Sequence, residues 1–314
     1  MNERPGTTSQ TCTAEDFVHV CPAVAAALAA RKPVVALETT LVTHGLPRPE
    51  GTRVAAALEE MVRGRNATPA TIGILDGRLR VGLSAAELER LAAADRPVKV
   101  SLGNLAAEVA AGGSGSTTVA ATMFAAWRAG IRVFATGGIG GVHHGVAETG
   151  DVSADLTALA RYPVAVVCAG AKAILDLPRT VEMLETLGVP VLGLGTDEFP
   201  AFYRRESGLP VDRRCATVAE VARVVRTHFD LGLTTGLVVA NPVPEEAALP
   251  KDLHDAALAA ARAGAAAARG RDATPWLLER MRVLTGDASV RTNEALLLAN
   301  ARAAADLAVA LAAG

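Results

Sequence analysis

The sequence predicts an α/β protein, a three-layer α/β/α fold with a mostly parallel central sheet. Short apolar runs that suit buried strands alternate with helix-like segments along the 314-residue chain. These runs are β-branched with little polar alternation, as in residues 164–168, which is typical of parallel strands covered on both faces. Polar side chains directly follow several of the runs. In such a sheet they meet at the carboxyl edge, where α/β folds bind ligands.

Length and composition set the class of protein. The chain shows no internal repeat or linker, so we predict a single domain over residues 1–314, with residues 1–13 as a disordered leader without an apolar signal core. The net charge of −2 offers no basic surface to nucleic acid or to an anionic membrane. No apolar run reaches the roughly 18 residues of a transmembrane helix. Four cysteines without metal spacing indicate a reducing, cytoplasmic setting.

The first hundred residues predict helices and strands in alternation. In order, we expect a helix at 22–32, a strand at 34–37, a loop at 39–51, a helix at 54–62, a hairpin of 71–75 with 78–83, a helix at 84–91 and a strand at 98–101. Asp76 and Gly77 form the hairpin turn, because glycine adopts positive φ at little cost. Ser84 with Glu87 three residues later predicts a capping box.

A glycine-rich segment precedes the helix expected at 119–130. Gly112, Gly113 and Gly115 lead into Ser116 and two threonines. A glycine-rich turn at a helix N-terminus offers free N–H groups and the positive end of the helix dipole to an anion. The segment is neither a P-loop nor a GxGxxG fingerprint, and a plain helix start is the alternative.

The rest of the chain repeats the alternation. We expect strands at 131–135, 164–168, 189–194 and 236–240, a loop at 196–208, and helices at 178–187, 218–231, 249–269, 275–284 and 293–311. Five glycines among residues 137–145 indicate a loop that lies close to a ligand. Asp151 and Asp155 around Ser153 suit a hard cation that keeps several waters. Alternatively, Ser153 caps a helix and Asp155 favours its dipole.

Polar residues at strand ends describe one crevice. The residues concerned are Glu38, Thr136, Lys172 and Asn241, with Lys99 near the end of its strand. Lys172 follows the most apolar strand and three small residues. It suits a phosphate as a point charge, or acts as a nucleophile if burial lowers its pKa enough to leave a free amine. A lysine that merely caps a loop is the third interpretation. For His44, in the loop after Glu38, both ligand contact and a structural role stay open.

Eight sequence blocks resemble one known family. They are ALETTLVTHGLPRPEG, GSTTVAATMFAA, FATGGIGGVHHG, DVSADL, PVAVVCAGAKAILDLPRT, GTDEFPAFYRRESG, LVVANPVPEE and TNEALLLAN. Together they span Ala36 to Asn300 and resemble pseudouridine-5′-phosphate glycosidases. The resemblance implies an α/β/α fold, a homotrimer, and Mn²⁺, although Mg²⁺ shares the same oxygen ligands. It also implies reversible cleavage of pseudouridine 5′-phosphate to uracil and ribose 5-phosphate.

The resemblance assigns roles residue by residue. It implies that Lys172 is the nucleophile, that Glu38 is the proton donor, and that Asp151 holds the metal through its waters. The residues that it implies for substrate binding are Lys99, Val119, Thr136, His143, Ser153, Ala154, Asp155 and Asn293. The chain departs from the family at His144, where a basic residue such as Arg is expected, and at residues 102–104, which replace a more charged stretch. Both departures bear on phosphate contacts.

The implied reaction needs a lysine and an acid. The bond that breaks joins two carbons, so the paired carboxylates of ordinary glycosidases do not suffice. An uncharged Lys172 can attack the anomeric carbon and open the ribose to an imine. Glu38 then protonates C5 of uracil, with its pKa raised by its place after an apolar strand. Two rival readings are a lysine-imine aldolase acting on a sugar phosphate and a non-catalytic nucleotide-binding regulator.

Overall fold

The computed structural model describes residues 17–46, 49–95, 97–263 and 273–314. Within these ranges eleven strands join in one sheet, ordered β1-β4-β3-β2-β7-β8-β11-β9-β10, with β6 pairing β3 and β5 pairing β6. The strands are β1 Val18–Val20, β2 Val34–Leu37, β3 Thr68–Leu75, β4 Arg78–Val81, β5 Val98–Val100, β6 Gly115–Thr117, β7 Val133–Ala135, β8 Ala165–Cys168, β9 Val191–Leu194, β10 Arg213–Cys215 and β11 Leu237–Ala240. All pairs are parallel except β3 with β4 and β3 with β6.

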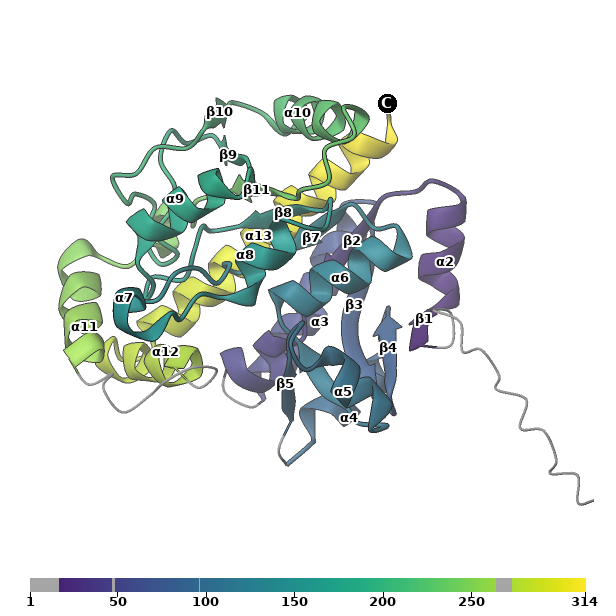
Figure 1. Ribbon diagram of the computed structural model, residues 1–314, viewed down its shortest axis with the longest axis horizontal. Helices are drawn as coiled ribbons and strands as arrows, with labels where there is room; N and C mark the ends of the chain where they lie inside the picture. Colours follow the sequence, from purple (N-terminus) through teal and green to yellow (C-terminus); the bar gives the residue numbers. More distant parts are fainter. Residues whose placement is uncertain (1–16, 47–48, 96, 264–272) are drawn as a thin grey trace, which may run out of the picture.

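Helices cover both faces of the sheet. They are α2 Pro22–Ala29, α3 Glu50–Gly64, α4 Ala85–Ala92, α5 Leu105–Ala110, α6 Val119–Ala129, α7 Val146–Thr149, α8 Ala154–Leu159, α9 Leu177–Thr186, α10 Val218–Asp230, α11 Lys251–Ala263, α12 Ala273–Leu284 and α13 Ala288–Ala312. Helices α6 and α8 pack together in front of the sheet in Figure 1, and α13 runs behind it beside α3 and α10. The predicted three-layer fold is confirmed.

The central strands form the middle of the core. Every residue of β2, β7, β8 and β11 is buried, because helices lie on both faces of these strands. The hairpin prediction is also confirmed, since Asp76 and Gly77 have φ of 52° and 69° and join two antiparallel strands. Ser84 and Glu87 form the predicted capping box at the start of α4.

Helix α13 corrects the expected start of the last helix. It begins at Ala288, five residues before the expected start, and it is long and apolar enough to cross a membrane by length and composition. It nevertheless has no uninterrupted apolar run of about 18 residues, because Asn300, Arg302 and Asp306 lie within it. The helix packs on β7, β8 and α3 and buries residues such as Leu296 and Ala304, so its apolar side covers the sheet.

Several short elements were not predicted. They are β1, β6, β10, α5, α7 and a π-helical turn, η1 Leu41–Gly45, while a 3-10 turn, η2 Glu245–Ala247, precedes α11. Three-residue strands are too short to show a periodic pattern. The expected leader, and the last residues of the helix expected at 249–269, lie outside the described residues.

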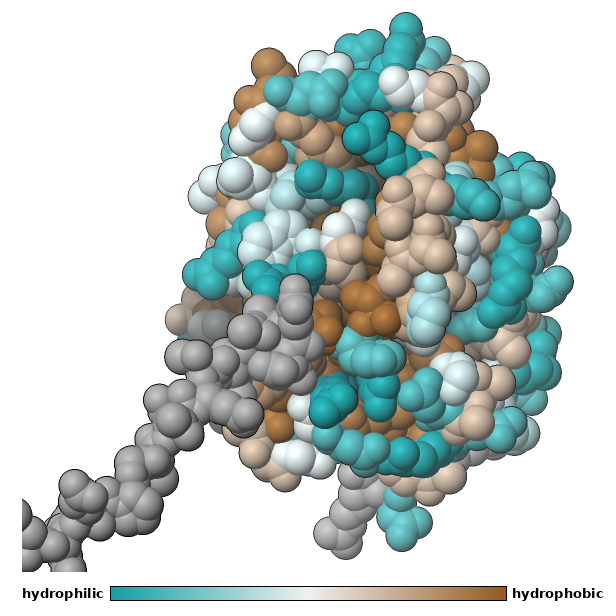
Figure 2. Space-filling view, turned by 90° about the vertical axis from the view of Figure 1, so that its right-hand side faces the viewer, coloured by the Kyte–Doolittle hydropathy of each residue, from teal (hydrophilic) through white to brown (hydrophobic). Residues whose placement is uncertain are grey.

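On the side that carries α2, hydrophilic residues surround small hydrophobic areas (Figure 2).

Candidate active site

A cavity of about 360 Å³ opens where β2, β7 and β8 end. Every residue that the resemblance assigned to the site lines it: Glu38, Lys99, Val119, Thr136, His143, Asp151, Ser153, Ala154, Asp155, Lys172 and Asn293. Asn241 was expected in the same crevice but is not among the lining residues. Its amide donates to Asn300 Oδ1 at 2.9 Å, and Asn300 donates to the Thr136 carbonyl at 2.8 Å, so the pair supports the end of β7 from behind.

Glu38 is buried at the end of β2, between two hydroxyl groups. Its Oε1 accepts a hydrogen bond from Thr136, which follows the neighbouring strand β7, and its Oε2 contacts the hydroxyl of Thr40. Burial raises the pKa of the Glu38 carboxyl, and the charge of Asp155 adds to the rise. The charge of Lys172 opposes it, and so does each of the two hydroxyls when it donates to the ionised carboxylate. A raised pKa keeps the carboxyl in its acid form to higher pH.

Lys172 lies beside the glycine-rich loop that follows β7. Its backbone N–H donates to the carbonyl of Ile139 at 3.1 Å. Two residues earlier, Gly170 has φ of 78°, and a Cβ there would lie 2.0 Å from the Pro200 carbonyl oxygen, so the turn requires glycine. The Lys172 side chain is partly buried and lines the cavity. Among the described residues, its amine makes no hydrogen bond or ion pair.

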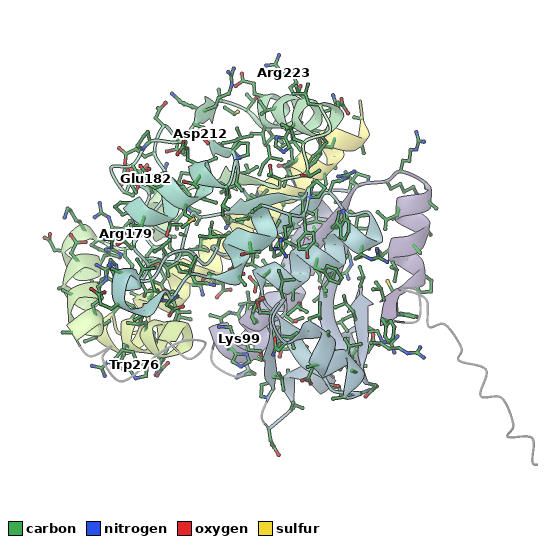
Figure 3. All side chains as sticks on the ribbon, viewed as in Figure 1. Lys99, Arg179, Glu182, Asp212, Arg223 and Trp276 are labelled. Atoms are coloured by element: carbon green, nitrogen blue, oxygen red, sulfur yellow. The ribbon has the colours of Figure 1, made fainter. Side chains whose placement is uncertain are left out.

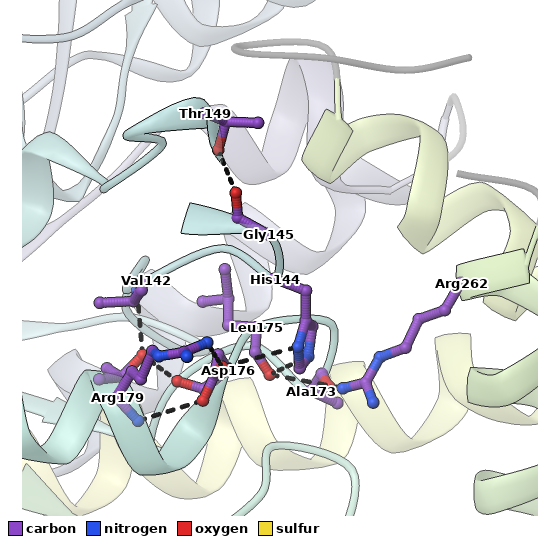
Figure 4. A network of polar contacts seen from close by, with 10 residues as sticks. Val142, His144, Gly145, Thr149, Ala173, Leu175, Asp176, Arg179 and Arg262 are labelled. Atoms are coloured by element: carbon purple, nitrogen blue, oxygen red, sulfur yellow. Dashed lines mark hydrogen bonds and ion pairs between the residues drawn. The ribbon is translucent and has the colours of Figure 1, made fainter. Parts of the chain in front are cut away.

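The side chains of His144 and Arg262 hold the backbone that follows Lys172 (Figure 4). Nε2 of His144 lies 3.1 Å from the Leu175 carbonyl oxygen, and the Arg262 guanidinium, from α11, donates to the carbonyls of Ala173 at 3.3 Å and Leu175 at 3.4 Å. Asp176 then caps α9 by accepting from the Arg179 backbone N–H at 3.1 Å. His144 does not line the cavity. This departure from the family therefore bears on the backbone after Lys172 rather than on a phosphate contact.

The two carboxylates around Ser153 have different environments. Asp155 is buried, and it accepts from the Ala120 backbone N–H at 3.0 Å and from that of Gly140 at 2.7 Å. Ser153 caps α8 by accepting from the Asp155 N–H at 3.2 Å. The helix-cap interpretation is thus confirmed for Ser153. Asp155 joins the glycine-rich loop to the start of α6 through these two hydrogen bonds. A cation shared by both carboxylates stays a prediction.

Asp151 remains as the carboxylate that a cation could use. Its side chain is partly buried and lines the cavity. In the described ranges no three His, Cys, Asp or Glu side chains gather as a metal site. A hard divalent cation that keeps most of its waters is often held by one carboxylate and a substrate phosphate. The residues present therefore fit a hydrated ion and not a site built from protein ligands alone.

Asp155→Asn should lower the free energy of unfolding by about 2–4 kcal/mol. Hydrogen bonds to a charged group contribute roughly 1.5–3 kcal/mol each, and an amide would turn its NH₂ toward one of the two backbone donors. Denaturant unfolding followed by circular dichroism measures the change. Asp151→Asn is the matched control and should change stability by less than about 0.5 kcal/mol. Equal effects of the two substitutions would contradict the bracing role of Asp155.

Lys99 and the start of α6 form another wall of the cavity. Lys99 extends from β5, far from the charged residues Arg179 on α9 and Arg223 on α10 (Figure 3). Asn104 accepts from the Ser101 N–H at 2.8 Å and donates to the Lys99 carbonyl at 3.2 Å. This departure from the family therefore shapes the backbone beside Lys99.

The predicted glycine-rich turn is not part of the site. Gly112 and Gly113 are separated from α6 by strand β6 and do not line the cavity. Thr118 is the cap of α6, and its hydroxyl accepts from the Ala121 N–H at 3.4 Å. Thr118 and Val119, rather than the glycines, bring the N-terminus of α6 to the cavity.

Other lining residues were missed by sequence reasoning. Thr40, Leu41 and Gly45 line the cavity from the segment that includes η1, and Phe202, Leu278 and Leu297 line it from distant parts of the chain. His44, for which the sequence left ligand contact open, also lines the cavity. Phe202 has φ of 62°, which is rare for an aromatic residue. A Cβ on Gly138 would lie 2.6 Å from the Phe202 ring, so the ring rests on this glycine. The one available signal was that the loop at 196–208 concentrates aromatic residues in an aromatic-poor chain.

Comparisons with known proteins agree along nearly the whole chain. The family model described as indigoidine synthase A like protein matches residues 23–310. A protein of Rhodospirillum centenum named pseudouridine-5′-phosphate glycosidase is 58% identical over 299 residues, covering 95% of this chain and 93% of the relative. One of the same name from Methylobacterium nodulans is 56% identical over 292 residues, covering 92% and 87%.

Two solved structures share the fold and are 37% and 38% identical in sequence to this chain. The prealnumycin C-glycosynthase AlnA, crystallised with ribulose 5-phosphate, is 38% identical with a TM-score of 0.88, covering 95% of this chain and 97% of that one. An indigoidine synthase A-like protein of Thermotoga maritima is 37% identical with a TM-score of 0.86, covering 94% and 97%.

Proposed function

This chain belongs to the indigoidine synthase A like protein family, and we propose that it acts as a pseudouridine-5′-phosphate glycosidase. The family expected from the sequence blocks is confirmed, because relatives at 56% and 58% identity bear that name. The observation that carries the proposal is one cavity lined by an acid with a raised pKa, Glu38, and by a lysine amine, Lys172. The reaction is the reversible cleavage of pseudouridine 5′-phosphate to uracil and ribose 5-phosphate.

The two residues divide the chemistry of carbon–carbon cleavage. The uncharged amine of Lys172 attacks C1′ and the bond from C1′ to the ring oxygen breaks. The ribose opens as the ring oxygen takes up the proton that the attacking nitrogen loses. Glu38 gives its proton to C5 of uracil, and the bond between C1′ and C5 breaks as C1′ forms an imine with the lysine nitrogen. Water adds to the imine carbon, ribose 5-phosphate leaves with the regeneration of the free amine, and the Glu38 carboxylate recovers a proton. The reverse sequence makes the carbon–carbon bond.

The 5′-phosphate and the uracil ring of the substrate fit different walls of the cavity. The 5′-phosphate suits Lys99 as a point charge, together with the N-terminus of α6 at Val119. The uracil ring suits an apolar wall, which Phe202 and Leu278 provide. A solved relative of the same fold was crystallised with ribulose 5-phosphate, which is comparable in size to the product ribose 5-phosphate.

The central experiment incubates the purified protein with pseudouridine 5′-phosphate and Mn²⁺ and measures free uracil by mass spectrometry. Uracil and ribose 5-phosphate released in equal amounts support the proposal. Turnover of a sugar phosphate to smaller fragments, with no release of uracil from the nucleotide, would instead support a lysine-imine aldolase. Binding of the nucleotide without any turnover would support a non-catalytic regulator.

Asp151 is the residue that we propose for the divalent cation, Mn²⁺ or Mg²⁺. A hydrated cation beside this carboxylate would supply positive charge and ordered water to the oxygen atoms of the substrate. The support for it is that Asp151 lines the cavity while Asp155 is occupied by backbone N–H groups. His143, whose backbone N–H donates to the Asp151 carbonyl at 3.1 Å, lies next to it.

Asp151→Ala should weaken Mn²⁺ binding and remove the reactivation of chelator-treated enzyme by Mn²⁺. Losing the Asp151 carboxylate removes the charged protein ligand that we propose for the hydrated ion. Electron paramagnetic resonance of free Mn²⁺ measures binding directly, and uracil release measures reactivation. Glu148→Ala, an exposed acidic residue on the nearby helix α7, is the matched control. Unchanged Mn²⁺ affinity in Asp151→Ala would place the metal elsewhere.

The homotrimer implied by the resemblance and the cytoplasmic location expected from the cysteines belong to the same proposal. The three described cysteines, Cys21, Cys168 and Cys215, are free thiols, which suits a reducing compartment. Analytical ultracentrifugation of the full chain measures the oligomeric state, and a monomer at micromolar concentration would contradict the trimer.

A further inference from the structure

The hydroxyl of Thr40 has one proton and two neighbouring acceptors. Its Oγ1 contacts Glu38 Oε2 and lies 3.1 Å from the backbone carbonyl oxygen of Thr117. A carbonyl oxygen only accepts, and a hydroxyl donates once. If Thr40 donates to Thr117, the hydrogen bond between Thr40 and Glu38 needs its proton from the carboxyl group. The other carboxyl oxygen accepts from Thr136.

We propose that Thr40 is a positioning residue that holds the acidic proton of Glu38 on Oε2. The chain of donors runs from Glu38 Oε2 to Thr40 Oγ1 and from Thr40 to the Thr117 carbonyl, while Thr136 donates to Oε1. Every donor and acceptor in this arrangement is satisfied. An ionised Glu38 would compete with the carbonyl for the single Thr40 proton and leave one buried acceptor unpaired, which is costly. The role rests on the proposed function, in which Glu38 is the acid.

The acceptor at the end of this chain is held in place by a buried threonine cluster. The Thr117 N–H donates to Thr39 Oγ1 at 3.0 Å, and the hydroxyls of Thr39 and Thr117 each donate to the Ile72 carbonyl at 2.7 Å. Thr122 donates to the Thr117 hydroxyl at 3.0 Å. Thr39, Thr117 and Thr122 are fully buried. Because β3, β6, α6 and the segment that follows β2 all take part, the Thr117 carbonyl keeps its direction and Thr40 has a fixed place to donate.

The charged groups around Glu38 do not decide where its proton lies. Lys172 and Asp155 are the charged side chains that act on the carboxyl, and they act in opposite directions. Neither makes a described hydrogen bond to it. The hydroxyls of Thr40 and Thr136 both hydrogen-bond to the carboxyl, and in the proposed arrangement they have opposite effects on its pKa. Thr136 donates and favours the charged form, whereas Thr40 accepts and favours the neutral acid.

This difference in sign makes the proposal testable. Thr40→Val and Thr136→Val both replace a hydroxyl by a methyl group, so the loss of polarity is alike in the two variants. We measure the pH profile of kcat/KM for uracil release, in which activity falls at alkaline pH as Glu38 ionises. The alkaline limb should move to lower pH in Thr40→Val and to higher pH in Thr136→Val. Thr40→Ser, which keeps the hydroxyl, should restore the wild-type limb.

A second measurement is independent of turnover. With ¹³C-labelled glutamate, carbon NMR follows the titration of the Glu38 carboxyl, assigned by comparison with Glu38→Gln. The pKa of Glu38 should fall in Thr40→Val relative to Thr136→Val. Equal upward shifts in both variants would overturn the proposal, because Thr40 would then be a second donor to an ionised carboxylate. If the wild type releases no uracil, the proposed function fails, and the NMR titration still decides the position of the proton.

Discussion

Lys172→Ala is expected to abolish uracil release from pseudouridine 5′-phosphate, by a factor on the order of 10⁴ or more, while the protein remains folded. Removal of a covalent nucleophile costs enzymes this much because no other group forms the bond. The fold should persist because the Lys172 amine makes no hydrogen bond or ion pair within the described residues. Uracil assays measure activity, and denaturant unfolding measures the fold. Full activity in this variant would contradict the nucleophile assignment.

Lys172→Arg separates the nucleophile from a simple positive charge. Arginine keeps the charge but stays protonated, so it cannot attack C1′. If Lys172 only attracts the phosphate, the arginine variant should retain most of the activity. Borohydride added during turnover should reduce the imine and leave a pentose-phosphate adduct on Lys172 of the wild type. Uracil release without any adduct would keep the function and contradict the imine route.

Reasoning from strand ends predicted most of the residues at the carboxyl edge but not all. Glu38, Thr136 and Lys172 follow β2, β7 and β8, three adjacent strands, and all three line the cavity. Asn241 follows β11 in the same way, but its amide turns to Asn300 on α13. The position after a strand is visible in the sequence. The direction of the Asn241 side chain depends on a helix about sixty residues away, so it cannot be predicted from the local sequence.

Other features of the site that the sequence left open also depend on packing at a distance. The spacing of Asp151 and Asp155 is the same whether both face a cation or one accepts from the backbone of Ala120 and Gly140. Leu278 and Leu297 join the cavity only because α12 and α13 fold back over the sheet edge. The buried β-branched runs, in contrast, specify strands locally. This is why the three layers were predictable and the far wall of the cavity was not.

Glu38→Gln is expected to lower kcat by about 10² to 10⁴-fold, the usual contribution of a positioned general acid. Glutamine fits the site because its NH₂ can donate to Thr40 while its oxygen accepts from Thr136. It has no acidic proton for C5 of uracil, so the carbon–carbon bond should stay intact. Glu182→Gln, on the exposed surface of α9, is the matched control (Figure 3). Normal cleavage by Glu38→Gln would mean that another group is the acid.

The same variant also tests the raised pKa through stability. Burial raises the pKa of Glu38 above the 4.5 of a free side chain, so the folded protein holds a proton that the unfolded chain releases. The wild type therefore loses stability as pH rises from 4.5 toward the raised pKa, at a slope of at most about 1.4 kcal/mol per pH unit. Glu38→Gln lacks this titration. The difference in free energy of unfolding, variant minus wild type, should therefore increase as pH rises through this window.

Denaturant unfolding of both proteins at a series of pH values measures that difference, with Glu182→Gln again as the control. A difference that is constant with pH would mean that Glu38 titrates alike in the folded and unfolded states. Its neutral form would then be no more favoured in the cavity than in water. An acid that is already ionised at neutral pH cannot protonate C5, so this result would remove Glu38 from the mechanism even if the variant were inactive. Stability and turnover must therefore agree for Glu38 to be the proton donor.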